Sequence, residues 1–161
     1  MANKISKIIG RINSLPSPLR TRALSLAVGN IVPYVGTSGL CVDELTEERA
    51  VVSVKNRRKV QNHIKTVHAS ASVLIAETAT GFICAMNCPD EKMLLMKSLS
   101  ARFLKRSKGR MKAVATLTPE QKEHMLTAEK GDVNVKVVLT DASGAEPVVS
   151  EMVWAWVPKK K

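Results

Sequence analysis

The chain has 161 residues, and 45% of them are hydrophobic, which predicts one folded domain with a substantial core and excludes an extensively disordered chain. Its 25 Lys and Arg residues outnumber its 14 Asp and Glu residues, and the net charge of +11 suits an anionic partner such as nucleic acid, anionic lipid or a phosphate-bearing coenzyme. The three cysteines form no metal-ligand pattern, and no secretory signal is evident. These features favour a cytoplasmic protein whose thiols are small core residues.

The first part of the sequence, residues 1–30, predicts a helical extension made of two helices. Isoleucines recur at helical spacing through residues 3–13, with lysine and arginine on the opposite side, so this segment is an amphipathic helix. Membrane-surface binding and packing against its own domain both fit such a helix, and packing is favoured. After a Ser/Pro-rich break, Ser17 is expected to cap a second helix with Pro18 at its first position, ending at about Gly29.

The second part, residues 36–158, has the period-two alternation of antiparallel strands. The expected strands lie at residues 40–45, 50–54, 99–104, 111–117, 133–138 and 147–157. A capped helical turn is expected at residues 118–121 and a hairpin turn at residues 141–144. On the last strand Trp154 and Trp156 share a face, which fits either a stacking platform for bases or, preferably, a core.

Between these strands, residues 67–84 form an apolar stretch with a single formal charge, Glu77. The stretch is nearly long enough to cross a bilayer, but its interspersed Ser, Thr and His residues favour a buried helix of a folded domain, so stable membrane insertion is not expected. The order of elements therefore predicts an α+β fold in which five to six antiparallel strands wrap around one long buried helix. A carboxylate at the middle of that helix is costly unless it is paired, hydrogen-bonded or used in function.

The residues around this carboxylate carry a family resemblance. Asn62, Thr66, His68 and Glu77 have the spacing of small hotdog-fold acyl-CoA thioesterases, and they most resemble the phenylacetate-type pattern N-x-x-G-T-x-H-G-G followed by an acidic residue nine positions after the His. The resemblance covers roughly residues 36–157. It implies a hotdog fold, thioester hydrolysis and a homodimer, with association of dimers into tetramers left open.

Three residues depart from that pattern. Lys65 replaces the first glycine, while Ala69 and Ser70 replace the two glycines after the His. Alanine and serine add one and two heavy atoms where a substrate would approach the backbone, and Lys65 places a long cation beside the site. These departures bear on whether catalysis survives in this chain.

The residues themselves suggest how such a site would work. The amides of Ala69 and Ser70 lie in the first helical turn, where N–H groups lack helical partners and can bind a developing oxyanion. Glu77 is expected to activate water or to attack the thioester, while Asn62 positions water or the carbonyl. Glu77 follows His68 by nine residues, about 13 Å along a helix axis, so the two helix positions can meet one carbonyl only if two subunits share each site. His68 is expected to orient or cap rather than to act as a base.

Several cations are expected to bind substrate along with His68, Thr66 and Lys65. Arg57, Arg58, Lys105 and Arg106 are candidates for the phosphates of coenzyme A. Coenzyme A enters as part of the substrate, so no separate cofactor and no metal are expected. The alternatives are a non-catalytic acyl-CoA or fatty-acyl binding protein and, more weakly, a nucleic-acid binder, which the five aromatic residues and the lack of a binding motif disfavour.

Overall fold

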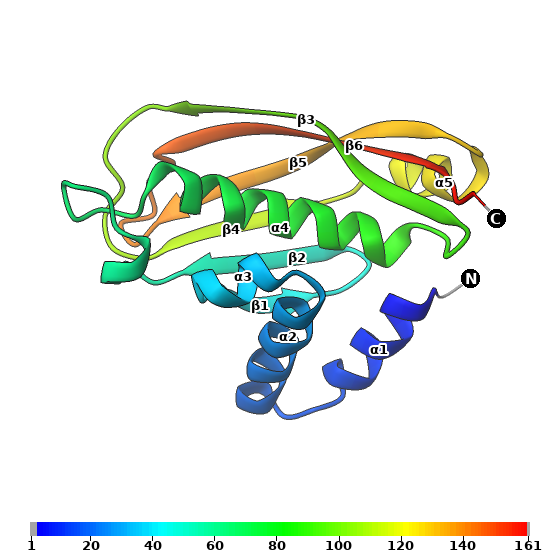
Figure 1. Ribbon diagram of the computed structural model, residues 1–161, viewed down its shortest axis with the longest axis horizontal. Coiled ribbons are helices and arrows are strands. Elements are labelled where there is room, and N and C mark those ends of the chain that lie inside the picture. The colour runs from blue at the N-terminus through cyan, green and yellow to red at the C-terminus, as the bar shows by residue number, and fades with distance from the viewer. Residues whose placement is uncertain (1–2, 161) are drawn as a thin grey trace.

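The computed structural model describes residues 3–160, which fold into one antiparallel sheet wrapped around a long helix (Figure 1). The helices are α1 (Lys4–Asn13), α2 (Ser17–Ile31), α3 (Pro33–Ser38), the short 3-10 helix η1 (Arg58–Val60), α4 (Ala69–Asn87) and α5 (Pro119–Thr127). The strands are β1 (Cys41–Leu45), β2 (Arg49–Val54), β3 (Lys92–Phe103), β4 (Met111–Thr116), β5 (Gly131–Asp141) and β6 (Val148–Pro158).

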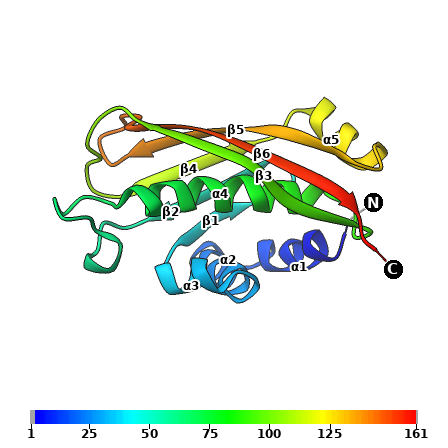
Figure 2. The same cartoon turned by 45° about the horizontal axis from the view of Figure 1, so that its top comes forward.

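The sheet has the strand order β1-β2-β4-β5-β6-β3, and every neighbouring pair is antiparallel. The sheet curls so that α4 lies along its concave side, while β3 and β1 form the two edges (Figures 1 and 2). The predicted α+β hotdog architecture, six strands around one long buried helix, is therefore confirmed.

The central helix α4 is buried over most of its length because nearly all of its side chains are apolar or small. Its buried hydroxyls are satisfied locally: Thr78 Oγ1 donates to the Leu74 carbonyl at 2.6 Å, and Thr80 Oγ1 donates to the Ala76 carbonyl at 2.8 Å. By length and composition α4 could cross a membrane, but 72% of that stretch is buried inside the protein. The sheet that surrounds it marks it as the core helix of the domain.

The N-terminal helices share this core. Ile9, Leu24, Val28 and Val35 are buried in the same hydrophobic cluster as the inward residues of the sheet and of α4. The side chain of Asn3 ties the start of α1 to the end of α4 by donating to the carbonyls of Ala85 and Cys88, at 2.7 and 2.6 Å. Residues 1–30 were expected as an extension to the domain, and the helices within them pack as an integral layer of it.

The start of α2 differs from the expectation. Pro16, not Ser17, is the N-cap residue, Ser17 and Pro18 lie inside the first turn, and no side chain caps the helix. Pro18 brings no N–H group, so the first turn has one donor fewer to satisfy and does not require a serine cap. The helix also continues two residues past Gly29 to Ile31.

Two further elements were not foreseen in full. The third N-terminal helix, α3, has only six residues and ends at Gly39, whose φ of 68° is left-handed. Strand β3 begins at Lys92 rather than at residue 99, and a bulge between Met96 and Ser98 shifts its register. Residues 93–96 are all apolar although Met93 and Leu95 are exposed, so the first half of the strand shows no period-two pattern in the sequence.

Candidate functional site

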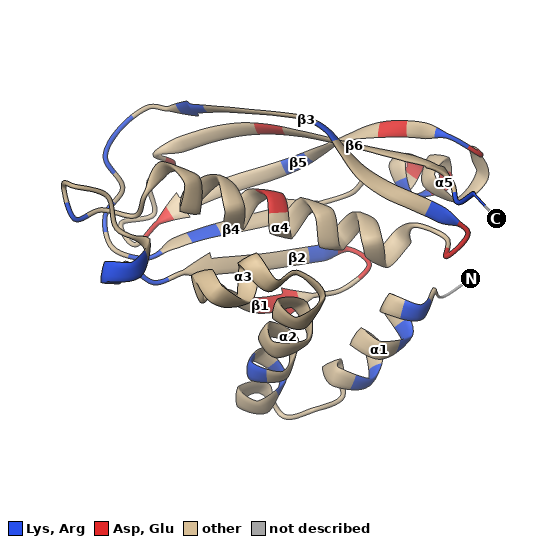
Figure 3. Ribbon diagram, in the orientation of Figure 1, with Lys and Arg blue, Asp and Glu red and all other residues tan. Residues whose placement is uncertain are grey.

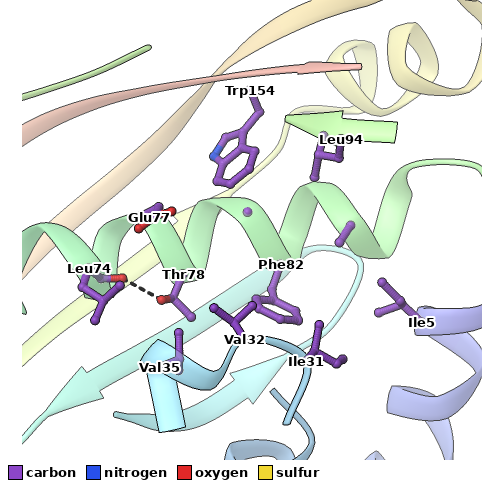
Figure 4. A pocket seen from close by; sticks show the side chains of 12 residues that line it. Ile5, Ile31, Val32, Val35, Leu74, Glu77, Thr78, Phe82, Leu94 and Trp154 are labelled. Carbon is purple, nitrogen blue, oxygen red and sulfur yellow. Dashed lines mark hydrogen bonds between the residues drawn. The ribbon is translucent and has the colours of Figure 1, made fainter. Parts of the chain in front are cut away.

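Glu77 lies at the middle of α4, where it lines an apolar pocket of about 230 Å³ (Figure 4). Much of the remaining wall comes from the N-terminal helices (Ile5, Ile31, Val35), from α4 (Leu74, Phe82) and from β3 and β6 (Leu94, Trp154). The pocket therefore brings together segments that are far apart in the sequence around one carboxylate.

The Glu77 carboxylate is half-buried, and among residues 3–160 no ion pair compensates its charge. Burial is the sole cause that shifts its pKa, and it raises that pKa above the ordinary value of 4.5. A carboxylate with a raised pKa in an apolar pocket is a stronger proton acceptor than a solvated one. The position is therefore suited to a general base or to a nucleophile.

Trp154 on β6 contributes an aromatic ring to the wall of this pocket. The indole Nε1 donates to Thr80 Oγ1 at 2.9 Å, which fixes the ring against α4. Gly81 makes room for that ring, because a Cβ atom at this position would lie 2.6 Å from Trp154 Cζ2. The position of Trp154 in the pocket wall (Figure 4) thus depends on the lack of a side chain at Gly81.

Asn62 organises the loop that leads into α4. Its Oδ1 accepts from the amides of Ile64 and Thr66 at 3.1 and 3.0 Å, and its Nδ2 donates to Thr66 Oγ1 at 2.8 Å. Lys65, within this turn, has a left-handed φ of 61°. This is the position where the resembling pattern has glycine, and a glycine would adopt that conformation without steric cost. The Lys65 side chain is exposed and lines neither this loop's pocket nor that of Glu77.

The start of α4 uses His68 as its N-cap. The imidazole Nδ1 accepts from the Ser70 amide at 3.1 Å, so this N–H, expected as part of an oxyanion site, is engaged within the protein. The expectation that His68 caps the helix is met by this hydrogen bond. Ala69 lies beside it, exposed at the helix start and lining a second pocket.

This second pocket, of about 240 Å³, gathers several of the predicted residues. Asn62, Thr66 and Ala69 line it, together with Lys105 and Arg106 from the β3–β4 loop. It lies at the N-terminal end of α4 and does not include Glu77. Within one chain, therefore, the Asn62 group and the Glu77 carboxylate belong to separate pockets.

The remaining predicted cations lie elsewhere. Arg57 Nη2 donates to the Gly39 carbonyl at 3.2 Å, Arg58 is exposed on η1, and neither side chain lines the two pockets. Basic segments nevertheless gather around the end of the molecule where α4 begins, whereas the middle of α4 carries an acidic residue (Figure 3). Residues 3–160 contain no group of three His, Cys, Asp or Glu side chains able to hold a metal ion.

Sequence reasoning missed the wall that the N-terminal helices contribute. Ile31, Val32 and Val35 look like ordinary apolar residues, and no spacing relates them to Glu77. The available signal was the apolar content of residues 19–35, which include Ile31, Val32 and Val35. Only the packing of α2 and α3 against the rest of the domain places some of these apolar side chains in the wall of the Glu77 pocket.

The sheet and the buried helix define the class of fold: this is an α+β protein with a hotdog-like architecture. Its structure is similar to that of a protein of unknown function and probable thioesterase from Pseudomonas aeruginosa, with a TM-score of 0.77 and 21% identity over 90% of this chain and 97% of that one. It is also similar to a thioesterase from Haemophilus influenzae, with a TM-score of 0.69 and 15% identity over 86% and 90% of the two chains. A thioesterase family protein from Silicibacter pomeroyi matches with a TM-score of 0.64 and 14% identity over 84% and 96%.

Residues 20–157 match the family described as Domain of unknown function (DUF4442), and the chain belongs to this family. The matched segment includes most of α2, in agreement with the packing of that helix into the common core. A search of curated proteins returned no match.

Proposed function

We propose that this protein is an acyl-CoA thioesterase-like hydrolase, related to the phenylacetate-type branch, with two sites shared across a homodimer. The observation that carries the proposal is the Glu77 carboxylate, which is half-buried in an apolar pocket and has no salt-bridge partner among residues 3–160. Such a charge is a cost to the fold, and a catalytic role explains why it is there. The likeness to thioesterases in fold supports the reaction class.

The reaction follows from the chemistry of the carboxylate. Glu77 accepts a proton from water, and the water oxygen attacks the thioester carbonyl carbon to form a C–O bond. The Ala69 amide, at the start of α4, stabilises the negative oxygen of the tetrahedral intermediate. The C–S bond then breaks, and the thiolate takes the proton, giving a carboxylic acid and the free thiol of coenzyme A. Direct attack by Glu77 through an anhydride, which water then hydrolyses, gives the same products.

The dimer supplies the second half of each site. Strand β3 is an edge strand of 12 residues, and its Met93, Leu95, Leu99 and Phe103 side chains are 43% to 52% exposed. A long apolar edge with unpaired backbone groups is a template for pairing with another strand. On α4 the partly exposed positions Ser70, Val73 and Glu77 share a face. Pairing of two β3 edges would bring this face toward the partner and the Asn62 pocket of one chain toward Glu77 of the other.

Coenzyme A would lie at the second pocket. Lys105 and Arg106 line it together with Asn62, Thr66 and Ala69, so the wall of this pocket includes two cations. Phosphate groups bind such cations through charge-assisted hydrogen bonds. The acyl group would then extend into the apolar pocket of Glu77.

The decisive experiment is a thiol-release assay on acyl-CoA esters from acetyl to palmitoyl and on phenylacetyl-CoA. Glu77→Gln is expected to lower turnover by about 10² to 10⁴, as for loss of a general base, while Glu123→Gln, an exposed glutamate on α5, serves as the matched control. Turnover that is unchanged in Glu77→Gln would remove this residue from the site.

The shared site has its own test. Asn62→Ala and Glu77→Gln are each expected to be inactive as homodimers. Coexpression should restore about a quarter of the wild-type activity, because half of the dimers are mixed and each mixed dimer contains one intact site. A lack of recovery, with mixed dimers shown to form, would place Asn62 and Glu77 at separate sites or within one chain.

One observation favours the alternative, a non-catalytic acyl-CoA binding protein on the same fold. The Ser70 amide is occupied by His68 Nδ1, which leaves fewer donors at the start of α4 for an oxyanion. Absence of turnover across the panel, with acyl-CoA still bound by calorimetry, would select this alternative.

A further inference from the structure

The first 42 residues differ in charge from the rest of the chain. They contain five cations (Lys4, Lys7, Arg11, Arg20 and Arg22), and the first acidic residue of the sequence is Asp43. Along α1 and α2 the ribbon carries basic segments and no acidic ones (Figure 3). The absence of any Asp or Glu leaves the positive charge of this segment uncompensated within the segment itself.

Exposed apolar side chains lie on the same helices. On α1 the exposed stripe is Lys4, Lys7, Ile8 and Arg11, at helical spacing, with Ile8 53% exposed. On α2 the exposed stripe includes Leu19, Arg22 and Leu26, with Leu19 and Leu26 58% and 59% exposed. Both stripes mix large aliphatic side chains with cations on the outer face, while the inner residues Ile9 and Leu24 are fully buried.

The apolar surface continues toward the Glu77 pocket. Ile31 and Val32, at the end of α2, line that pocket and are also 54% and 36% exposed. Tyr34, the next large side chain, is 62% exposed. Exposed apolar side chains of the N-terminal helices thus include two that belong to the pocket wall, and α1, α2 and α3 lie on the side of the molecule opposite β5 and β6 (Figures 1 and 2).

We propose that the outer surface of α1–α3 is a peripheral docking surface for anionic lipid bilayers. Cations would contact the phosphates of the headgroups, and Ile8, Leu19 and Leu26 would enter the interfacial region, as in helices that lie in the plane of a membrane. The proposal concerns reversible surface binding of the folded protein, with α4 remaining in the core. Docking would place the wall formed by Ile31 and Val32 next to lipid acyl chains.

The charge pattern decides between this partner and others. A second copy presenting the same surface across a two-fold axis would oppose its cations to identical cations, which disfavours a self-interface. A nucleic acid would use the cations but would leave the exposed aliphatic side chains without a role, because bases stack on aromatic rings. An anionic bilayer uses both kinds of side chain.

The test is sedimentation of the full-length protein with vesicles of phosphatidylcholine alone or mixed with phosphatidylserine. Binding is expected only to the mixed vesicles and should weaken as salt is raised. Lys7→Glu/Arg11→Glu should weaken binding roughly thirtyfold or more, since each cation near an anionic surface contributes about a factor of five. The control Lys112→Glu/Lys136→Glu makes the same change in net charge on exposed positions of β4 and β5 and should leave binding nearly unchanged.

A second pair of variants tests the apolar contribution. Ile8→Ser/Leu26→Ser should weaken vesicle binding at least tenfold while leaving the melting temperature and the oligomeric state unchanged, because both side chains already face solvent. The proposal fails if the two charge-reversed proteins bind equally weakly, which would mean a diffuse charge effect. It also fails if Ile8→Ser/Leu26→Ser retains full binding, or if this variant dissociates the oligomer, which would assign the surface to a subunit interface. None of these outcomes depends on thioesterase activity.

Discussion

The N-terminal helices are expected to unfold together with the sheet, and Leu24→Ala provides the test. Leu24 lies on the inner face of α2, is 0% exposed, and belongs to the same buried cluster as the inward residues of β2 and α4. Truncation of a fully buried leucine removes its transfer free energy and leaves a cavity, which costs about 3 kcal/mol or more. For a chain of this size that corresponds to a fall of roughly 6 to 12 °C in Tm.

The chain provides a convenient reporter for this experiment. Its two tryptophans, Trp154 and Trp156, both lie on β6, and they contact α4 and the end of α5, so tryptophan fluorescence in urea reports the unfolding of the sheet together with the helices packed on it. Leu24→Ala changes only α2, yet the fluorescence midpoint is expected to fall by the full amount. Leu26→Ala is the matched control, because Leu26 is 59% exposed on the same helix and its truncation should change the free energy of unfolding by less than about 0.5 kcal/mol.

A different result would refute the common core. If residues 1–30 formed a separate unit, Leu24→Ala would leave the fluorescence midpoint unchanged. Circular dichroism would then show an earlier loss of helix. Such a pair of transitions would mean that the contacts between α2 and the sheet contribute little to the free energy of unfolding. The part of the Glu77 pocket wall that the N-terminal helices form could then unfold while the sheet stays folded.

Three further predictions concern the candidate site. Because burial raises the pKa of Glu77 above 4.5, thiol release should fall as pH decreases through that raised pKa, and the acidic limb of a pH–rate profile should lie at higher pH than a solvated glutamate gives. The native state also binds this proton more tightly than the unfolded state, so the free energy of unfolding should decrease as pH rises through the same window. This decrease should be absent in Glu77→Gln. Gly81→Ala should displace the Trp154 ring, since the new Cβ atom would lie 2.6 Å from it. The substitution should lower the free energy of unfolding by about 1 to 3 kcal/mol and shorten the acyl chains that are accepted in the ester panel. An unaltered chain-length profile would mean that Trp154 takes no part in acyl binding. The Thr66 amide donates to Asn62 Oδ1 at 3.0 Å, so Asn62→Ala should remove this hydrogen bond and accelerate hydrogen exchange at the Thr66 amide. Asn62→Asp keeps an acceptor oxygen and should leave the Thr66 amide protected. Loss of protection in Asn62→Asp as well would contradict this role of Asn62 in the turn.

Much of the fold could be predicted from the sequence because its signals are local. The period-two alternation located most strands, and the capping box at α5 was visible as Thr118 followed by Gln121 three residues later. The first half of β3 escaped the same method, since its exposed Met93 and Leu95 are apolar and residues 93–96 therefore show no alternation. The helix α3 escaped because six residues carry too little periodicity.

The sequence by itself determined that Glu77 is the sole charge on a long apolar helix, because this depends only on composition. It also determined that the start of this helix and Glu77 cannot both reach one substrate carbonyl within a chain, because their separation depends only on the helical rise. Tertiary structure decided what surrounds that carboxylate. Trp154 and Ile31 meet at Glu77 from β6 and α2, and Lys105 meets Ala69 from a loop between β3 and β4. Such contacts join residues tens of positions apart through the packing of whole elements, and no local pattern in the sequence encodes them.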